Sequence, residues 1–460
     1  MNRRHASGRC ALPPLLRYPT VDELGARAAA LVARRPRDAR LRRVGTSRAG
    51  TPMWLLSVGH GSRQALVVAG PHANEPVGGA TVLRLAERAL ADPRYTEGAD
   101  ATWNLLLSLD PDGLRRNEGW LSGPYTLGRY FRNFFRPGFH EQPEWLPDGA
   151  AAAALPETRT LLELQDELRP FLQCSLHGVD VGGGFVELTD DLPGLARRVA
   201  HTAARLGIPR ELGSYDTLYW PGLGPAVYRI PPPRPGDLAA AITEAAVEST
   251  WYHPHRYGTV TAIVEAPMWG VAAVEDDSPP ADRAAVLRTV SHTLRRDAQL
   301  LQRLLGRLRP HVAGAPDAAR LLAPVDDYLL VCPGLADTWD PDIADGARPL
   351  PPLNTAHLAA LRIAGRRLAL RTAGLLHQLV TASGRDPAGV LPDLDRLVGE
   401  WCADYRDGCG ARWIPVARQV EYQSRVVLHA FELAERYAPA CSRSGESGWG
   451  SGAAVPMHLE

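Results

Sequence analysis

The stretch QALVVAGPHANEP, residues 64–76, decides how this sequence folds and where its chemistry lies. Residues 64–69 are almost continuously apolar, which is typical of a strand buried on both faces of a mostly parallel sheet. Gly70 and Pro71 end the strand, and His72 and Glu75 follow before a helical pattern begins at about Val77. The stretch therefore predicts a buried strand whose carboxyl end carries two side chains of the types that bind metals.

The same alternation of strand and helix continues on both sides of this stretch. The helix at 20–32 opens with a predicted capping box, Thr20 to Glu23. Further strands are predicted at 53–58, 103–109, 172–176 and 259–264, and further helices at 77–90, 156–168, 195–206 and 236–248. Residues 113–156 show little periodicity and are interpreted as a long functional loop region. The pattern predicts an α/β fold with a mixed, mostly parallel twisted sheet and helices on both faces.

The strand signals fade after Asp276, and helical patterns take over at 281–308, 355–382 and 413–436. We therefore expect a loose leader at 1–17, an α/β catalytic domain at 18–278, an all-helical C-terminal region at 279–440 and a disordered tail at 441–460. The helical region could cover the α/β domain, roof the active site or form an oligomer interface.

Composition excludes several classes of function. The 460 residues carry a formal net charge of +0, so neither nucleic acid nor a membrane surface is an expected partner. The sequence holds no Lys, which excludes Schiff-base chemistry. Its six Cys form no CxxC pair, and no apolar run is long enough for a membrane span. The first residues are too interrupted by prolines for a secretory signal, so we expect a cytoplasmic protein.

Two more candidate site residues directly follow predicted strands. His177 comes after 172–176, and Glu265 comes after 259–264. Ligands bind at the carboxyl edge of an open α/β sheet, so these side chains are expected to meet His72 and Glu75 there. Two imidazoles and one carboxylate are a common ligand set for catalytic zinc, and a second carboxylate can take a proton from the bound water. With 14 His in the chain, a chance HxxE pair remains an open alternative at this point.

Four motifs, in order, resemble those of the zinc metallocarboxypeptidases related to carboxypeptidases A and B. GPHANEP resembles the family's HxxE zinc signature, SLHG at 175–178 its third-ligand strand, and TAIVEAP at 261–267 its catalytic-glutamate strand. LDPDGLRRNEGW at 109–120 resembles its NPDG loop, with Asp110 in place of the usual Asn. The resemblance covers roughly residues 20–275. It implies one Zn²⁺ per chain, bound by His72, Glu75 and His177, with Glu265 as the general base.

The resemblance also implies two functional arginines. Arg115, shortly after the DPDG turn, is the candidate that stabilises the oxyanion. Arg132, with Asn133 beside it, resembles the family's NRN motif and is the candidate that binds the terminal carboxylate of the substrate. Phe131 stands where the family has Asn, which puts strict C-terminal exopeptidase activity in doubt.

The remaining candidates are less well placed. A substrate-capping Tyr is common in the family, and Tyr252 is the candidate here, with Tyr257 as the alternative. Arg116 and Arg136 are neighbours of the two functional arginines, and a solvated surface residue is the alternative interpretation of any of these arginines, Arg132 included. Cys174 is interpreted as a structural thiol, and residues 182–184, three consecutive glycines, as backbone room at the pocket.

The sequence thus predicts a zinc-dependent hydrolase that cleaves a C-terminal peptide bond, with metal-activated water and Glu265 as base. The expected substrate is a peptide or small amide with a free carboxylate. One alternative is an N-acyl amino acid deacylase of the aspartoacylase and succinylglutamate desuccinylase kind. The other is a catalytically silent binding protein on the same fold.

Overall fold

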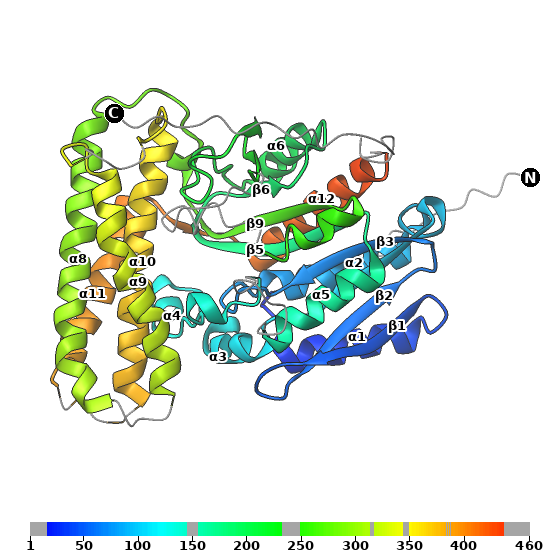
Figure 1. Ribbon diagram of the computed structural model, residues 1–460, viewed down its shortest axis with the longest axis horizontal. Helices are drawn as coiled ribbons and strands as arrows, with labels where there is room; N and C mark the ends of the chain where they lie inside the picture. Colours follow the sequence, from blue (N-terminus) through cyan, green and yellow to red (C-terminus); the bar gives the residue numbers. More distant parts are fainter. Residues whose placement is uncertain are drawn as a thin grey trace, which may run out of the picture.

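The computed structural model describes residues 16–144, 155–231, 249–312, 317–343, 349–382, 384, 386 and 388–436. One twisted sheet runs through the molecule with helices on both of its faces, and a layer of long helices stands across one end of it (Figure 1). No helix among these residues is long and apolar enough to cross a lipid bilayer.

The sheet is mixed, with a parallel centre. Its strand order is β1-β2-β4-β3-β5-β9-β6-β8-β7, and β10 pairs with β9. The four central strands β4, β3, β5 and β9 are parallel to one another. The pairs β1 and β2, β2 and β4, β6 and β9, and β7 and β8 are antiparallel. The strands are β1 (Ala39–Thr46), β2 (Pro52–Val58), β3 (Arg63–Ala69), β4 (Ala101–Leu106), β5 (Leu172–Gly182), β6 (Phe185–Leu188), β7 (Gly222–Gly224), β8 (Val227–Arg229), β9 (Val260–Gly270) and β10 (Arg412–Trp413).

Helices cover both faces of this sheet. One face packs against α1 (Val21–Arg34), α2 (Val77–Ala91), α6 (Leu195–Leu206) and α12 (Val416–Ala434) in the main hydrophobic core. The other face packs against α5 (Pro156–Leu168), whose Leu161 and Leu164 contact Leu66 and Val68 of β3. Two shorter helices, α3 (Pro111–Leu121) and α4 (Leu127–Arg132), lie in the long connection after β4. Burial on both faces explains the continuous apolar run of β3.

The helical layer consists of α8 (Arg283–Val312), α9 (Ala318–Trp339), α10 (Thr355–Ala382) and α11 (Leu391–Ala403). Helix α10 joins it to the α/β part (Figure 1). Arg371 of α10 forms a buried two-bond ion pair with Asp180 of β5, with distances of 2.6 and 3.0 Å. A Cβ at Gly374 would lie 1.9 Å from the carbonyl oxygen of Phe131, so only glycine allows α10 to approach α4 this closely.

The predicted fold class is confirmed, and several predicted elements have the observed bounds, including 156–168, 195–206 and 355–382. The prediction was wrong in three respects. Strands β5 and β9 extend well past 176 and 264, the predicted loop at 113–156 contains α3 and α4, and β1, α9 and α11 were not predicted. Helix α12 belongs to the predicted helical region but packs on α2, α6 and β9. The predicted helix 236–248, residues 1–15 of the predicted leader and the whole predicted tail lie outside the described residues.

Candidate metal centre

The register of the central strands brings the predicted site residues to one level of the sheet. Ala69, the last residue of β3, pairs with Leu176 of β5, so His177 lies one step beyond the end of β3. His177 in turn pairs with Glu265 of β9 in parallel register, and both side chains therefore point to the same face. Both residues lie inside long strands. They mark the carboxyl edge of the sheet only at β3, which ends one residue before their level.

The loop after β3 supplies the other two residues. In the first turn of α2, a Cβ at Gly78 would lie 3.1 Å from both the Cβ and the carbonyl oxygen of Leu176. Glycine thus lets the start of α2 lie against β5, which places the preceding Glu75 next to His177. The Glu75 carboxylate also accepts the backbone N–H of Gly178 at 3.1 Å.

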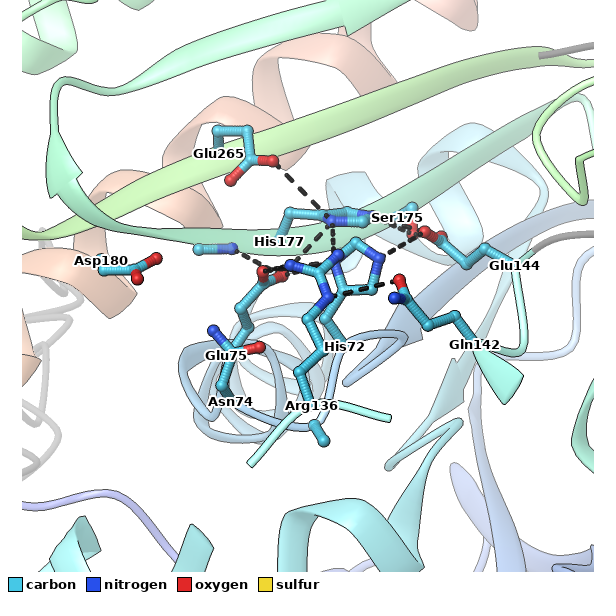
Figure 2. A network of polar contacts seen from close by, with 12 residues as sticks. His72, Asn74, Glu75, Arg136, Gln142, Glu144, Ser175, His177, Asp180 and Glu265 are labelled. Atoms are coloured by element: carbon cyan, nitrogen blue, oxygen red, sulfur yellow. Dashed lines mark hydrogen bonds and ion pairs between the residues drawn. The ribbon is translucent and has the colours of Figure 1, made fainter. Parts of the chain in front are cut away.

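His72, Glu75 and His177 bring three donor atoms together, as Figure 2 shows. The Nδ1 atoms of the two imidazoles are 3.1 Å apart, and Glu75 Oε2 lies 3.1 Å from Nδ1 of His72 and 3.3 Å from Nδ1 of His177. Ligands of a tetrahedral zinc ion at 2.0–2.1 Å are about 3.3 Å from one another. All three side chains are buried. The donor set and its spacing therefore fit a zinc ion.

Glu144 lies on the opposite edge of the same two rings. Its Oε1 is 3.2 Å from Nε2 of His177, and its Oε2 is 3.5 Å from Nε2 of His72, so these three residues form a second group that could hold a metal. However, Oε1 already accepts hydrogen bonds from Trp251 Nε1 at 2.7 Å and Ser175 Oγ at 2.8 Å. Metal-binding His residues commonly donate their other N–H to a carboxylate. We therefore assign the metal to the Nδ1 side and to Glu144 the role of orienting both rings.

The charges of the cluster favour a bound cation. Burial and the neighbouring Arg136 lower the pKa of His72 to about 4, which leaves that ring neutral and able to bind a metal. Burial opposes protonation of His177 as well, yet Glu144 and Glu75 raise its pKa well above the ordinary value. Among the residues that the structure describes, three carboxylates and one guanidinium contact this cluster, so a positive charge between the Nδ1 atoms is stabilised.

Glu265 lies on the metal side of His177, with Oε1 3.8 Å from Nδ1, and Figure 2 shows it across that ring from Glu144. Its Oε2 is buried and has no hydrogen-bond partner in the part of the chain that the structure describes. Burial raises the pKa of Glu265 well above the usual range, and His177 offsets this only in part. A carboxylate with a raised pKa and a free oxygen is suited to accept a proton from water.

The structure brings Arg136 to the site, although no role was predicted for it. Its Nη1 is 3.4 Å from Glu75 Oε1, and its Nε donates to Gln142 Oε1 at 3.2 Å. The side chain is 15% exposed, so a fixed positive charge faces the metal position from a nearly dry environment. Such a cation can stabilise a developing negative charge or hold a carboxylate.

The two predicted arginines have other partners. Arg115 pairs with Asp22 at the start of α1, at 2.6 Å, and is 39% exposed. Arg132 pairs with Asp395 of α11 at 3.0 Å, because α4 packs against the helical layer. Neither guanidinium is paired with the ligand cluster among the described residues, and the roles expected of Arg115 and Arg132 stay predictions.

The other two substrate-binding candidates also have structural partners. The Asn133 amide donates to the carbonyl of Arg129 at 2.8 Å and so ends helix α4. The Tyr252 hydroxyl donates to the carbonyl of Ile230 at 3.0 Å. Residues 182–184 make room for the chain itself rather than for a ligand, since a Cβ at Gly183 would lie 2.6 Å from the backbone N of Glu211.

Sequence reasoning missed Glu144 and Arg136 for the same reason. Both lie in the aperiodic connection between β4 and α5, where no strand or helix period tells which way a side chain points. The available signal was chemical: a carboxylate and an arginine in a long loop that leads to the strand carrying His177.

This fold and this site together define a metal-dependent hydrolase. Residues 26–181, about a third of the chain, match the zinc carboxypeptidase family, which confirms the resemblance read from the motifs over that part. The matched part contains His72, Glu75 and His177 but ends before Glu265. The chain is therefore a zinc metallocarboxypeptidase-like hydrolase. No curated protein sequence matches it.

Several solved structures are similar at low identity. A metallopeptidase-like protein of Shewanella amazonensis is 16% identical, with 54% of this chain and 84% of that chain covered and a TM-score of 0.37. Carboxypeptidase A of Helicoverpa armigera is 14% identical, with 55% and 65% covered and a TM-score of 0.36. Bovine thrombin-activatable fibrinolysis inhibitor is 12% identical, with 54% and 86% covered and a TM-score of 0.36. Similarity at this level defines no substrate.

Proposed function

We propose that the protein is a zinc-dependent amide hydrolase that cleaves the C-terminal peptide bond of a short peptide. The observation that carries the proposal is the triangle of His72 Nδ1, His177 Nδ1 and Glu75 Oε2, with sides of 3.1 to 3.3 Å, beside the free carboxylate of Glu265. A bound zinc ion supplies Lewis-acid polarisation of the carbonyl and lowers the pKa of a coordinated water.

The protein side chains supply the remaining steps. Glu265 accepts a proton from the attacking water and passes it to the leaving amine. Arg136 carries a permanent charge and stabilises the negative charge that develops on the substrate oxygen, or holds the substrate carboxylate. Glu144 keeps both imidazoles in the tautomer and orientation that direct Nδ1 to the metal.

The test is Glu265→Gln in the zinc-loaded protein, assayed on benzoylglycyl amino acids with a free C-terminus. We expect kcat to fall by about 100- to 10,000-fold because the amide cannot take up the proton. Zinc content, measured by elemental analysis, should stay at one per chain. His72→Ala should lose zinc as well as activity, and the exposed Glu167→Gln is the control. Wild-type turnover by Glu265→Gln would contradict the proposal.

A second candidate function is deacylation of a small N-acyl amino acid. The observation that favours it is the ion pair between Arg132 and Asp395, which engages the arginine expected to bind a peptide terminus. A comparison of kcat/KM for N-acetyl amino acids and for benzoylglycyl dipeptides separates the two functions. A clear preference for the N-acetyl substrates would establish the deacylase.

A further inference from the structure

The segment from Phe134 to Phe139 carries Arg136 to the metal centre, and contacts outside that centre hold the segment in place. Arg136 lies in its middle, with Nη1 3.4 Å from Glu75 Oε1. Residues 134–138 belong to no helix or strand. Their backbone groups therefore need partners outside a regular hydrogen-bond ladder, and those partners decide where the guanidinium lies.

Helix α10 of the helical layer holds the start of this segment. Helix α4, which leads into the segment, packs against α10 (Figure 1). The side-chain amide of Gln378 donates to the carbonyl of Phe134 at 2.6 Å. The guanidinium of Arg371 lies over the Phe134 ring, 5.0 Å from its centroid. Arg371, Gly374 and Gln378 follow a helical spacing, so a single face of α10 makes these contacts.

Helix α9 of the same layer holds the other end of the segment. The carboxylate of Asp327 accepts the backbone N–H of Phe139 at 2.6 Å. A Cβ at Gly138 would lie 2.9 Å from Asp327 Oδ2, so the chain passes close to α9 at this point. The helical layer thus binds the backbone two residues before Arg136 and three residues after it.

The α/β part adds an anchor at Phe135. Asn117 of α3 accepts the backbone N–H of Phe135 at 3.1 Å and donates to its carbonyl at 2.8 Å. These bonds lie on the same side of Arg136 as the bond from Gln378. The bond to Asp327 lies on the other side. Its loss would free the backbone beyond Arg136 from the helical layer.

We propose that the helical layer positions the arginine of the site, with Asp327 and Gln378 as positioning residues that act through Arg136. The inference rests on the proposed hydrolase function and gives the helical layer a part in it. The layer lies outside residues 26–181, the part that matches the zinc carboxypeptidase family. A charged group that stabilises a reacting atom must be held closely, because a misplacement of about 1 Å can lower the rate by about 100-fold.

The turnover test is a double-mutant cycle on benzoylglycyl amino acids. Asp327→Ala and Gln378→Met should each lower kcat/KM by about 10-fold through a displaced guanidinium. In an Arg136→Ala background neither should have a further effect above about 2-fold, because the residue through which they act is gone. Asp327→Asn, whose amide oxygen can still accept the N–H, should keep most of the wild-type rate. Equal losses in the two backgrounds would contradict the inference and leave both contacts with a structural role only.

Asp337→Ala is the matched control on the same helix. Its carboxylate pairs with Arg295 of α8 at 2.8 Å, within the helical layer, and its removal should leave kcat/KM unchanged. Zinc content should stay at one per chain in every variant, because none of the three ligands lies in the segment. Loss of zinc from Asp327→Ala would refute the inference, since the layer would then support the ligands rather than Arg136.

A binding test keeps the inference separate from the hydrolase proposal. Titration calorimetry of the zinc-loaded protein uses 3-phenylpropanoate, a carboxylate without an amide bond. Arg136→Ala and Asp327→Ala should each weaken binding several-fold, and the double variant should bind no more weakly than Arg136→Ala. Unchanged binding in both single variants, or a further loss in the double variant, would overturn the inference. The expected pattern without cleavage of any peptide would support it and contradict the hydrolase function instead.

Discussion

Arg132 and Arg136 are four residues apart in the sequence, but their side chains point to different parts of the structure. Arg132 is on α4 and faces the helical layer, where Asp395 binds it. Arg136 follows the end of α4, and its guanidinium reaches Glu75. A motif match identified the first, but the direction of a side chain in a short helix depends on what the helix packs against. We therefore expect Arg136 to be the anion-binding arginine of this site.

At the residue scale this assignment predicts unequal effects of two equivalent substitutions. Arg136→Ala should lower kcat/KM by about 100-fold or more, because it removes a fixed cation from a nearly dry site. Arg132→Ala removes an exposed ion pair, which typically contributes about 1 kcal/mol or less to stability, and should leave kcat/KM nearly unchanged. Steady-state kinetics with matched zinc content checks both, and the reverse order of effects would restore the role to Arg132.

The metal ligands themselves could be predicted because each follows a strand with a strong apolar signal. His72 and Glu75 come after β3, and His177 lies in β5 just after its most apolar segment. Glu144 could not be predicted in this way. Its carboxylate is held beside the two rings by Ser175 and Trp251, and those contacts join residues far apart in the sequence.

At the scale of elements, helix α12 contacts β5 and β9, the two strands that carry His177 and Glu265. Its Gln423 is fully buried, and its side-chain amide donates to the carbonyls of His177 at 2.8 Å and Val264 at 3.0 Å. It thus joins the strand that carries a metal ligand to the strand that carries the base. Helix α12 was predicted from its helical period. That period does not indicate that the helix packs on the sheet, whereas the helices that precede it form a separate layer.

This contact predicts that Gln423→Leu weakens zinc binding by about 10-fold, as the loss of a supporting contact around a metal site commonly does. A matched control exists one turn earlier. Gln419 is equally buried and bonds to Tyr18 and to the carbonyl of Ile414, away from the ligand strands. Gln419→Leu should lower thermal stability to a similar extent but leave zinc affinity unchanged, which a chelator competition measures. Equal zinc affinities in the two variants would show that Gln423 is only structural.

Other elements escaped prediction for identifiable reasons. Strand β1 is mostly polar and half exposed at the edge of the sheet, so it lacks the apolar run of a central strand. Helix α9 contains Pro324 and Pro333, which interrupt the helical signal. Strand β5 was predicted too short because LHGVDVG contains Gly and Asp, residues that are rare in strands.

At the scale of the whole molecule, the helical layer and the sheet meet around buried ionisable groups. Asp180 with Arg371 is one, and Glu211 is another. Glu211 lies near Arg367 and Ile363 of α10, and its Oε2 accepts the N–H of Gly183 at 2.7 Å. Burial raises the pKa of Glu211 to about 8, so the folded protein holds this carboxyl protonated at neutral pH. Oligomerisation through the helical layer stays a prediction.

The position of Glu211 makes the stability of the folded molecule depend on pH in a defined direction. Its pKa is about 8 when folded and near 4.5 when unfolded, so between these values the folded state binds one more proton. Raising the pH through this window therefore lowers the free energy of unfolding, by about 1.4 kcal/mol per pH unit for this group. Glu211→Gln is neutral at every pH, so it should gain stability relative to the wild type as the pH rises.

Thermal unfolding of the zinc-loaded proteins at pH 6, 7 and 8 checks this dependence. The comparison between variants cancels the effect of pH on zinc binding, which both proteins share. Glu167→Gln removes a carboxylate that is exposed and paired with Arg42, so it should follow the wild-type slope. If Glu211→Gln followed the wild-type slope as well, Glu211 would be ionised in the folded protein. The contact between α10 and the sheet would then contain a buried charge that Arg367 neutralises.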